Sequence, residues 1–296
     1  MRRTLWIVVV AALAPALAGG VRAHSAAPRS ILFVGNSFTF GAGSPVQRFH
    51  PERVTDLNKE GIGGVPALFK TFATQAKLEY DVSLETSPGK SLSWHFTEKR
   101  PQLQGKWDVV ILQGYSTLDQ QHPGDPAEHV KGARDLAGLF KAANAAAEID
   151  LVTTWSRADQ VYKPEGHWYG KPIYQMAEDL AAASALALQG SRDLTTSIPV
   201  GGAWNRAMRE GVADPNPFDG VDFGKVNLWT WDQYHASTEG YYLEALVIFG
   251  TVTGVDPVSL GQRESAASDL GMSTAVVRAL QKVAHDELEA AKQKRH

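Results

Sequence analysis

A serine and an Asp/His pair near opposite ends of the chain carry the residue types of nucleophilic catalysis. Ser37 lies in the segment 35–39, Gly-Asn-Ser-Phe-Thr, and Asp232 and His235 lie in the segment 232–235, Asp-Gln-Tyr-His. A serine hydroxyl is a weak nucleophile until a base takes its proton, and histidine has an ordinary pKa suited to that task. A carboxylate must orient the imidazole. We therefore predict Ser37 as nucleophile, His235 as general base and Asp232 as the orienting acid.

The Asp-x-x-His spacing does not select this pair by itself, because Asp119 and His122 share it. The earlier pair lies in a loop rich in Gln, Pro and Gly, directly after a predicted strand, where a solvated turn is the favoured interpretation. The later pair precedes a predicted helix that Ser237 can cap. The segment 35–39 also has a plain interpretation as an ordinary turn.

The elements that must position these residues follow from apolar patterning. Five strands are predicted, from short apolar runs at 30–35, 107–112, 149–154 and 197–201 and from an alternating segment at 80–85. Helical spacing predicts helices at 65–80, 127–146, 172–188, 237–253 and 273–294 and one that begins at 203. The long predicted loops are 41–64, 119–126, 161–170 and 214–227. Alternating strands and helices favour a parallel sheet covered on both faces. Ser37 would then follow the carboxyl end of the first strand, where ligands bind in such sheets.

Three ordered segments make the chain resemble the SGNH, or GDSL-like, serine hydrolases. The segment 31–39 is similar to the nucleophile block of that family, with Asn36 in place of the usual aspartate. In the segment 87–91, Gly89 follows the second strand, and the segment 232–235 matches the closing block in spacing and position. A bacterial subset of unknown function shares the Gly-Asn-Ser-Phe-Thr start. The resemblance implies a three-layer α/β/α, flavodoxin-like domain with a parallel sheet of about five strands.

The resemblance also implies acyl-ester hydrolysis through a serine acyl-enzyme, without a cofactor. The oxyanion would be held by the backbone N–H groups of Ser37 and Gly89. The chain departs from the family where an asparagine is usual, because the segment 112–117 reads Leu-Gln-Gly-Tyr-Ser-Thr. Either Ser116 or Thr117 occupies the asparagine position, and Gln113 is the nearest side-chain amide. Losing one oxyanion donor costs about 10²- to 10³-fold in turnover, so we expect a replacement, with Gln113 and Ser116 as candidates.

Residues near these segments are candidates for substrate contact, namely Asn36, Trp94, Tyr115, Trp155 and Trp231. Aromatic rings beside such a site can stack on a sugar or on an apolar acyl group. Their alternative role is core packing, which large aromatic side chains often serve. The expected partner is a small-molecule or carbohydrate ester. A non-catalytic glycan-binding protein on the same fold is the alternative function.

Composition excludes several other classes. The chain has 296 residues, no cysteine and a formal net charge of −3. Disulfides, thiolate metal sites and a cysteine nucleophile are therefore absent. Lys and Arg are scattered except for a short basic tail, whereas a nucleic-acid binder needs a basic face. The chain has neither a His-x-x-x-His spacing nor a glycine-rich phosphate loop. We expect no metal, no cofactor and no nucleic acid.

Residues 1–23 are typical of an export signal. Arg2 and Arg3 precede an apolar run from Leu5 to Ala18, and the segment 21–23 offers small residues at cleavage-site spacing. Cleavage would leave residues 24–296, predicted as a single domain in the periplasm or outside the cell, without membrane contact. Loss of the signal's three arginines, one positive charge each, would shift the net charge from −3 to −6. An uncleaved N-terminal anchor is the alternative.

Overall fold

Successive side chains of the first strand point to opposite faces of a sheet, and both sets are buried. In β1 (Arg29–Gly35), Ile31 and Phe33 pack into one apolar cluster, while Leu32 and Val34 pack into another. All four side chains are 0% exposed. A strand buried in this way needs cover on both faces of its sheet, as parallel sheets have.

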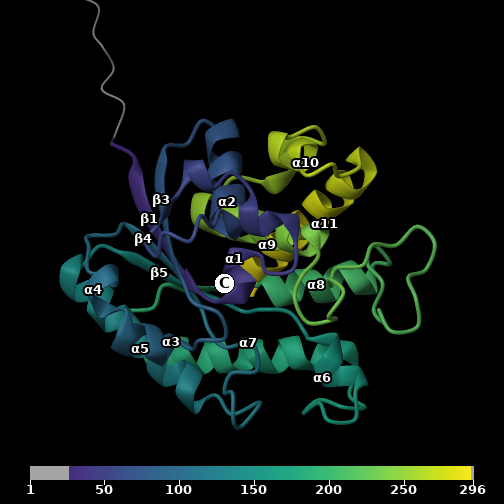
Figure 1. Ribbon diagram of the computed structural model, residues 1–296, viewed down its shortest axis with the longest axis horizontal. Helices are drawn as coiled ribbons and strands as arrows, with labels where there is room; N and C mark the ends of the chain where they lie inside the picture. Colours follow the sequence, from purple (N-terminus) through teal and green to yellow (C-terminus); the bar gives the residue numbers. More distant parts are fainter. Residues whose placement is uncertain (1–26, 295–296) are drawn as a thin grey trace, which may run out of the picture.

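The computed structural model describes residues 27–294, and within them six strands form one parallel sheet. Their order is β2-β3-β1-β4-β5-β6 (Figure 1). The remaining strands are β2 (Thr55–Asp56), β3 (Tyr80–Thr86), β4 (Val109–Gln113), β5 (Glu148–Val152) and β6 (Thr196–Ile198). All of these strands except β2 overlap the five strand segments that were predicted from the sequence. The additional strand, β2, pairs with β3 at the sheet edge and lies in a stretch predicted as a loop.

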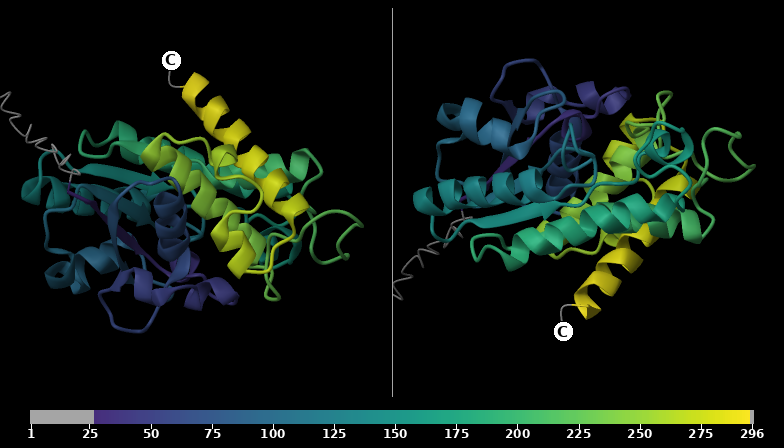
Figure 2. Two further views of the ribbon diagram at one scale, coloured as in Figure 1. Left: turned by 90° about the horizontal axis from the view of Figure 1, so that it is seen from above. Right: turned by 90° about the horizontal axis from the view of Figure 1, so that it is seen from below.

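Two helical layers cover the sheet (Figures 1 and 2). One face carries α2 (Gly64–Gln75), α8 (Val200–Arg209), α9 (Thr238–Thr253), α10 (Ser265–Asp269) and α11 (Thr274–Gln293). The other carries α3 (Leu92–Glu98), α4 (Arg100–Leu103), α5 (Ala127–Ala143) and α7 (Ile173–Gln189). Two short helices, α1 (Ser37–Phe40) and α6 (Ala158–Tyr162), follow β1 and β5. Three 3₁₀ turns complete the described elements, at Pro45–Arg48, Pro51–Arg53 and Pro257–Leu260. The predicted three-layer α/β/α fold is confirmed.

Serine side chains begin three of these helices. The Ser237 hydroxyl accepts a hydrogen bond from the Gly240 N–H at 3.1 Å, as predicted for the helix after His235. Ser91 caps α3 and Ser273 caps α11 in the same way. A side-chain cap satisfies one backbone donor of the first turn and fixes where the helix starts. The cap at Ser237 therefore sets the place of the segment that carries the Asp/His pair.

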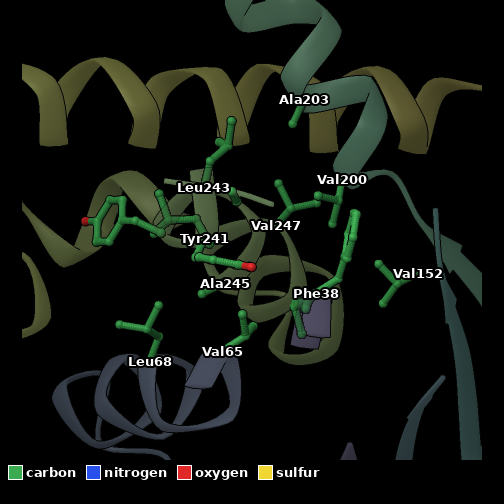
Figure 3. Packing of buried hydrophobic residues seen from close by; sticks show 14 of the residues in the cluster. Phe38, Val65, Leu68, Val152, Val200, Ala203, Tyr241, Leu243, Ala245 and Val247 are labelled. Carbon is green, nitrogen blue, oxygen red and sulfur yellow. The ribbon is translucent and has the colours of Figure 1, made fainter. Parts of the chain in front are cut away.

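The residue next to the nucleophile candidate is anchored in the core. Phe38 points from α1 toward Val152 of β5 and Val200 of α8 (Figure 3). Its side chain is 0% exposed. Burying an aromatic ring of this size stabilises the fold by about 1.5–3 kcal/mol, so the position of α1 is fixed by packing.

The predicted signal, residues 1–23, lies outside the described residues. Within 27–294, none of the helices combines the length and the apolar character needed to cross a membrane.

The buried His129 of α5 makes stability depend on pH. Burial lowers the pKa of His129 from its ordinary 6.5 to about 4. Below pH 6.5 the unfolded state binds a proton at this histidine and the folded state does not. The contribution of His129 to the free energy of unfolding is therefore fully present above pH 6.5 and is lost as the pH falls toward 4. We expect the free energy of unfolding in urea to fall by roughly 2 kcal/mol between pH 7 and pH 5 through this group.

The His129→Gln variant should lose that part of the pH dependence, measured by urea titration at both pH values. His122→Gln is the matched control, because the His122 side chain is 74% exposed. Equal pH slopes in the two variants would contradict the assignment to His129.

Candidate active site

The nucleophile candidate lies in the turn that joins β1 to α1. β1 ends at Gly35, Asn36 caps the helix, and Ser37 is its first residue. Asn36 Oδ1 accepts a hydrogen bond from the Phe38 N–H at 3.2 Å. The turn is tight, because a Cβ at position 35 would lie 2.2 Å from Thr39 Oγ1. Ser37 is 5% exposed, and as the first residue of a helix it has a backbone N–H without an intrahelical acceptor.

The Gln113 side chain, at the end of β4, holds this turn in place. Its Oε1 accepts hydrogen bonds from the Asn36 N–H and the Thr39 hydroxyl, both at 3.0 Å. Its Nε2 donates to the Gly114 carbonyl. Asn36 Nδ2 in turn donates to the carbonyls of Gly114 at 3.1 Å and Lys90 at 3.0 Å. These bonds tie the turn to β4 and to the loop after β3.

Asp232 and His235 lie in a tight loop before α9. The Thr230 N–H donates to the His235 carbonyl at 2.8 Å, which closes the loop. Asp232 Oδ1 accepts hydrogen bonds from the backbone N–H groups of Tyr234 at 3.0 Å and His235 at 2.9 Å. The carboxylate is thus held by the backbone of the same loop that carries the imidazole.

Asp232 orients the His235 imidazole and leaves its other nitrogen free. His235 Nδ1 lies 2.6 Å from Asp232 Oδ2, and their side chains are 15% and 19% exposed. Partial burial raises the pKa of Asp232. Hydrogen bonds from the His235 ring and from the backbone N–H groups of His235 and Tyr234 lower it by more than burial raises it, so the pKa lies below its ordinary value. A carboxylate bound to Nδ1–H leaves Nε2 as the unprotonated nitrogen. This Nε2 is buried and has no hydrogen-bond partner among the described residues.

Aromatic packing brings the two segments together. The Phe38 ring lies 5.7 Å from the His235 ring and stacks on Trp155 at 4.2 Å, centroid to centroid. Trp155 Nε1 donates to the Tyr234 carbonyl at 3.2 Å. The turn of Ser37 and the loop of His235 are therefore neighbours. His235 Nε2 is not hydrogen-bonded to the Ser37 hydroxyl, and such catalytic bonds often form only when substrate is bound.

The second Asp/His pair is an exposed turn. Asp119 Oδ1 accepts hydrogen bonds from the backbone N–H groups of Gln121 and His122, both at 2.7 Å. The His122 Nδ1 lies 3.7 Å from that oxygen, and its side chain is 74% exposed. A ring this exposed is solvated and weakly oriented. The geometry favours His235 as the base.

A pocket next to the nucleophile turn contains two predicted substrate contacts. The Ser87 N–H donates to the Gly35 carbonyl at 3.0 Å, which places the following turn beside the nucleophile. In that turn Gly89 is exposed and has a φ of 65°, which favours glycine. Gly89, Trp94 and Tyr115 line one pocket of about 250 Å³. Its other lining residues are polar, namely Lys90, Ser91, Asp119, Gln120, Gln121 and Glu128.

Two further predicted residues do not line the pocket of Gly89. Ser116 is 3% exposed, and its hydroxyl accepts a hydrogen bond from Arg157 Nη1 at 3.1 Å. Trp231 is 81% exposed and lines a different pocket of about 510 Å³ with Ser44 and Thr238. Trp231 is thus accessible to a ligand but does not share the pocket of Gly89.

No protein-family model and no curated protein matches the chain, whereas solved structures do. A DUF4886 family protein from Bacteroides uniformis matches with a TM-score of 0.61 at 16% identity, over 88% of this chain and 95% of that one. A protein described as a GDSL-like lipase, from Parabacteroides merdae, matches with a TM-score of 0.51 at 17% identity, over 76% and 95%. A variant of an acetyl-xylooligosaccharide esterase from Geobacillus matches with a TM-score of 0.50 at 16% identity, over 76% and 94%. The chain has the SGNH hydrolase fold.

Within this SGNH fold, three predicted roles need correction. Trp155 is 0% exposed between Phe38 and Trp204, so the predicted substrate contact is wrong. Asn36 is 2% exposed and its Nδ2 donates to the carbonyls of Lys90 and Gly114 outside the turn, so its predicted substrate contact is also wrong. The Gln113 amide is 1% exposed and bonded to the turn and to its own strand end. Those contacts favour a positioning role over oxyanion donation.

Three further residues belong to this site and were not predicted from the sequence, namely Tyr234, Arg157 and Asp159. The Tyr234 ring lies 3.8 Å from the His235 ring, and the Arg157 guanidinium lies 3.8 Å above the Tyr234 ring. The position of Arg157 shortly after β5 was the available signal, because loops at the carboxyl ends of parallel strands build the sites of such sheets.

Within 27–294, His, Asp and Glu side chains form no group of three or more that could hold a metal ion. That the reaction needs no metal ion stays a prediction.

Proposed function

We propose that this SGNH-fold protein is an exported serine esterase that hydrolyses acyl esters, with O-acetyl groups on carbohydrate as its substrate class. The observation that carries the proposal is the contact of 2.6 Å between His235 Nδ1 and Asp232, with a buried, unpartnered Nε2 near the turn of Ser37. An oriented imidazole with one free nitrogen has the arrangement of a general base.

The reaction follows from these groups. His235 Nε2 takes the Ser37 hydroxyl proton as Oγ attacks the ester carbonyl carbon, and the carbonyl oxygen becomes an oxyanion. The imidazolium then gives this proton to the departing alkoxide, which leaves an acyl group on Ser37. A water molecule attacks the acyl-enzyme with the same proton transfers, and the acid and free serine are released. Asp232 stabilises the imidazolium in both halves of the cycle.

Backbone and hydroxyl donors are proposed for the oxyanion. The N–H groups of Ser37 and Gly89 belong to adjacent turns, which the Ser87-to-Gly35 hydrogen bond holds side by side. Ser116 is the proposed additional donor. Its oxygen accepts from the Arg157 guanidinium, so its own proton remains to be donated.

The acetylated-carbohydrate class rests on the pocket and on a structural neighbour. Trp94 and Tyr115 line the pocket with Gly89, and the pocket wall also carries amide and carboxylate side chains. Such a mixture suits a sugar, which has apolar faces and hydroxyl groups. The neighbour from Geobacillus is an acetyl-xylooligosaccharide esterase. Export is proposed from the signal-like pattern of residues 1–23.

A fluorophosphonate probe tests the nucleophile. Wild-type protein should be labelled covalently at Ser37, and Ser37→Ala should not be labelled. Acetate release from acetylated xylo-oligosaccharide, compared between the same two proteins, tests the substrate class. Absence of labelling in the folded wild type, or equal labelling of Ser37→Ala, would reject the esterase and leave the glycan-binding alternative.

A further inference from the structure

Arg157 makes an unusually complete set of contacts next to the proposed base. It lies between β5 and α6, and its side chain is 13% exposed. Its Nε and Nη2 donate to the two carboxylate oxygens of Asp159, at 3.0 and 2.7 Å. Its Nη1 donates to the Ser116 hydroxyl at 3.1 Å. A guanidinium bound on both edges is held in one plane, since its fork geometry is rigid.

That plane forms the outer layer of a stack that ends at the imidazole. The Arg157 guanidinium carbon lies 3.8 Å from the Tyr234 ring centroid. The Tyr234 ring lies 3.8 Å from the His235 ring, with an interplanar angle of 36°. Cations are attracted to the faces of aromatic rings, so the contact with the guanidinium holds the Tyr234 ring in place beside the His235 ring.

The stack restrains a motion that Asp232 leaves open. The hydrogen bond between Asp232 and His235 Nδ1 fixes one nitrogen, but the ring can still tilt about that contact. Tyr234 occupies one face of the ring and limits the tilt. Because His235 Nε2 has no hydrogen-bond partner of its own, ring packing must set its direction.

Residues on either side of Arg157 also hold the backbone of the loop that carries Asp232 and His235. The Asp159 N–H donates to the Gln233 carbonyl at 3.2 Å, and Trp155 Nε1 donates to the Tyr234 carbonyl. The guanidinium charge is balanced by the Asp159 carboxylate, so the stack adds no net charge beside the base.

We infer that Arg157 is a positioning residue: paired with Asp159, it holds Tyr234 against the His235 imidazole and so aims Nε2 at the nucleophile. The catalytic part of this inference rests on the proposed function. The structural part, restraint of the His235 ring, does not.

Arg209 provides a matched control, because it has the same kinds of contact away from the site. Its guanidinium carbon lies 4.4 Å from the Tyr174 ring centroid, and its Nη2 donates to Glu178 at 2.7 Å. The side chains of this ion pair are 52% and 50% exposed. Arg209→Ala therefore removes a comparable stacked ion pair that touches no part of the catalytic loop.

The experiment compares Arg157→Ala, Tyr234→Leu and Arg209→Ala with wild type. The first two should lower kcat for p-nitrophenyl acetate by about 10- to 100-fold, the cost of a misplaced base, while KM changes little. Added guanidinium chloride, below denaturing concentration, should partly restore kcat in Arg157→Ala alone. Arg209→Ala should match wild type in both constants.

A second readout does not depend on activity. The downfield proton resonance of His235 Nδ1–H, assigned by its loss in His235→Ala, should broaden in Arg157→Ala and persist in Arg209→Ala. An unchanged resonance in Arg157→Ala would overturn the inference whether or not the protein is an esterase. A rise in KM with unchanged kcat would also overturn it, since Arg157 would then bind substrate. If the resonance broadens but wild type is neither labelled nor active, the esterase proposal fails and the restraint of His235 stands.

Discussion

His235→Ala should lower kcat for p-nitrophenyl acetate by about 10⁴- to 10⁶-fold, the range expected when a serine hydrolase loses its general base. Asp232 holds Nδ1 at 2.6 Å, and only Nε2 remains to take the Ser37 proton. Without the imidazole, the hydroxyl has no described base nearby, and residual turnover comes from the oxyanion donors and substrate binding. Steady-state kinetics at pH 7.5 measures this loss, with circular dichroism to verify folding.

His122→Ala is the control for that result, because His122 shares the Asp-x-x-His spacing. Its ring is exposed and lies 3.7 Å from Asp119 at the closest nitrogen–oxygen contact. Kcat should remain within about twofold of wild type. If His122→Ala abolished turnover and His235→Ala did not, the base role would move to the exposed loop and the proposed triad would be withdrawn.

The strands β1, β4 and β5 could be predicted because each is a largely apolar run with cover on both faces, and β3 could be predicted because its residues alternate. β2 could not, because Thr55 and Asp56 are polar, form a two-residue strand and pair only at the sheet edge. Nothing in their periodicity separates them from the surrounding loop. The position of Ser37 at a strand end followed from the alternation of elements, since consecutive parallel strands place their carboxyl ends on one side.

Side-chain direction was the part of the site that patterning could not supply. Trp94 and Trp155 both lie shortly after predicted strands, yet Trp94 lines the pocket of Gly89 and Trp155 is 0% exposed. The difference arises from Trp204 of α8, which stacks on Trp155 at 4.6 Å and turns it inward. A partner that distant in sequence leaves no local signal. Arg157 does have a local signal in its position after β5, but its contact with Tyr234 has none, because Tyr234 belongs to a remote loop.

Gln113→Met should destabilise the protein and, through that, impair catalysis. The substitution keeps the length of the side chain but removes the Oε1 that accepts from the Asn36 N–H and the Thr39 hydroxyl. Gln113, Asn36 and Thr39 are at most 3% exposed, so water cannot replace the lost bonds. Each buried donor left unsatisfied costs about 1–3 kcal/mol, which gives roughly 2–6 kcal/mol for the two. The turn that carries Ser37 should then shift, and kcat should fall together with stability.

Calorimetry and kinetics on the same variant decide between the two roles of this amide. A positioning residue predicts a Tm lower by several degrees, at roughly 2–4 °C for each kcal/mol. An oxyanion donor predicts an unchanged Tm and a kcat lower by about 10²- to 10³-fold. Gln104→Met, an exposed amide directly after α4 that does not line the pocket of Gly89, should change neither quantity. A loss of kcat at wild-type Tm would return Gln113 to the oxyanion hole. A fall in both would leave Ser116 as the side-chain donor in place of the missing asparagine, because its hydroxyl proton is the one that Arg157 leaves free.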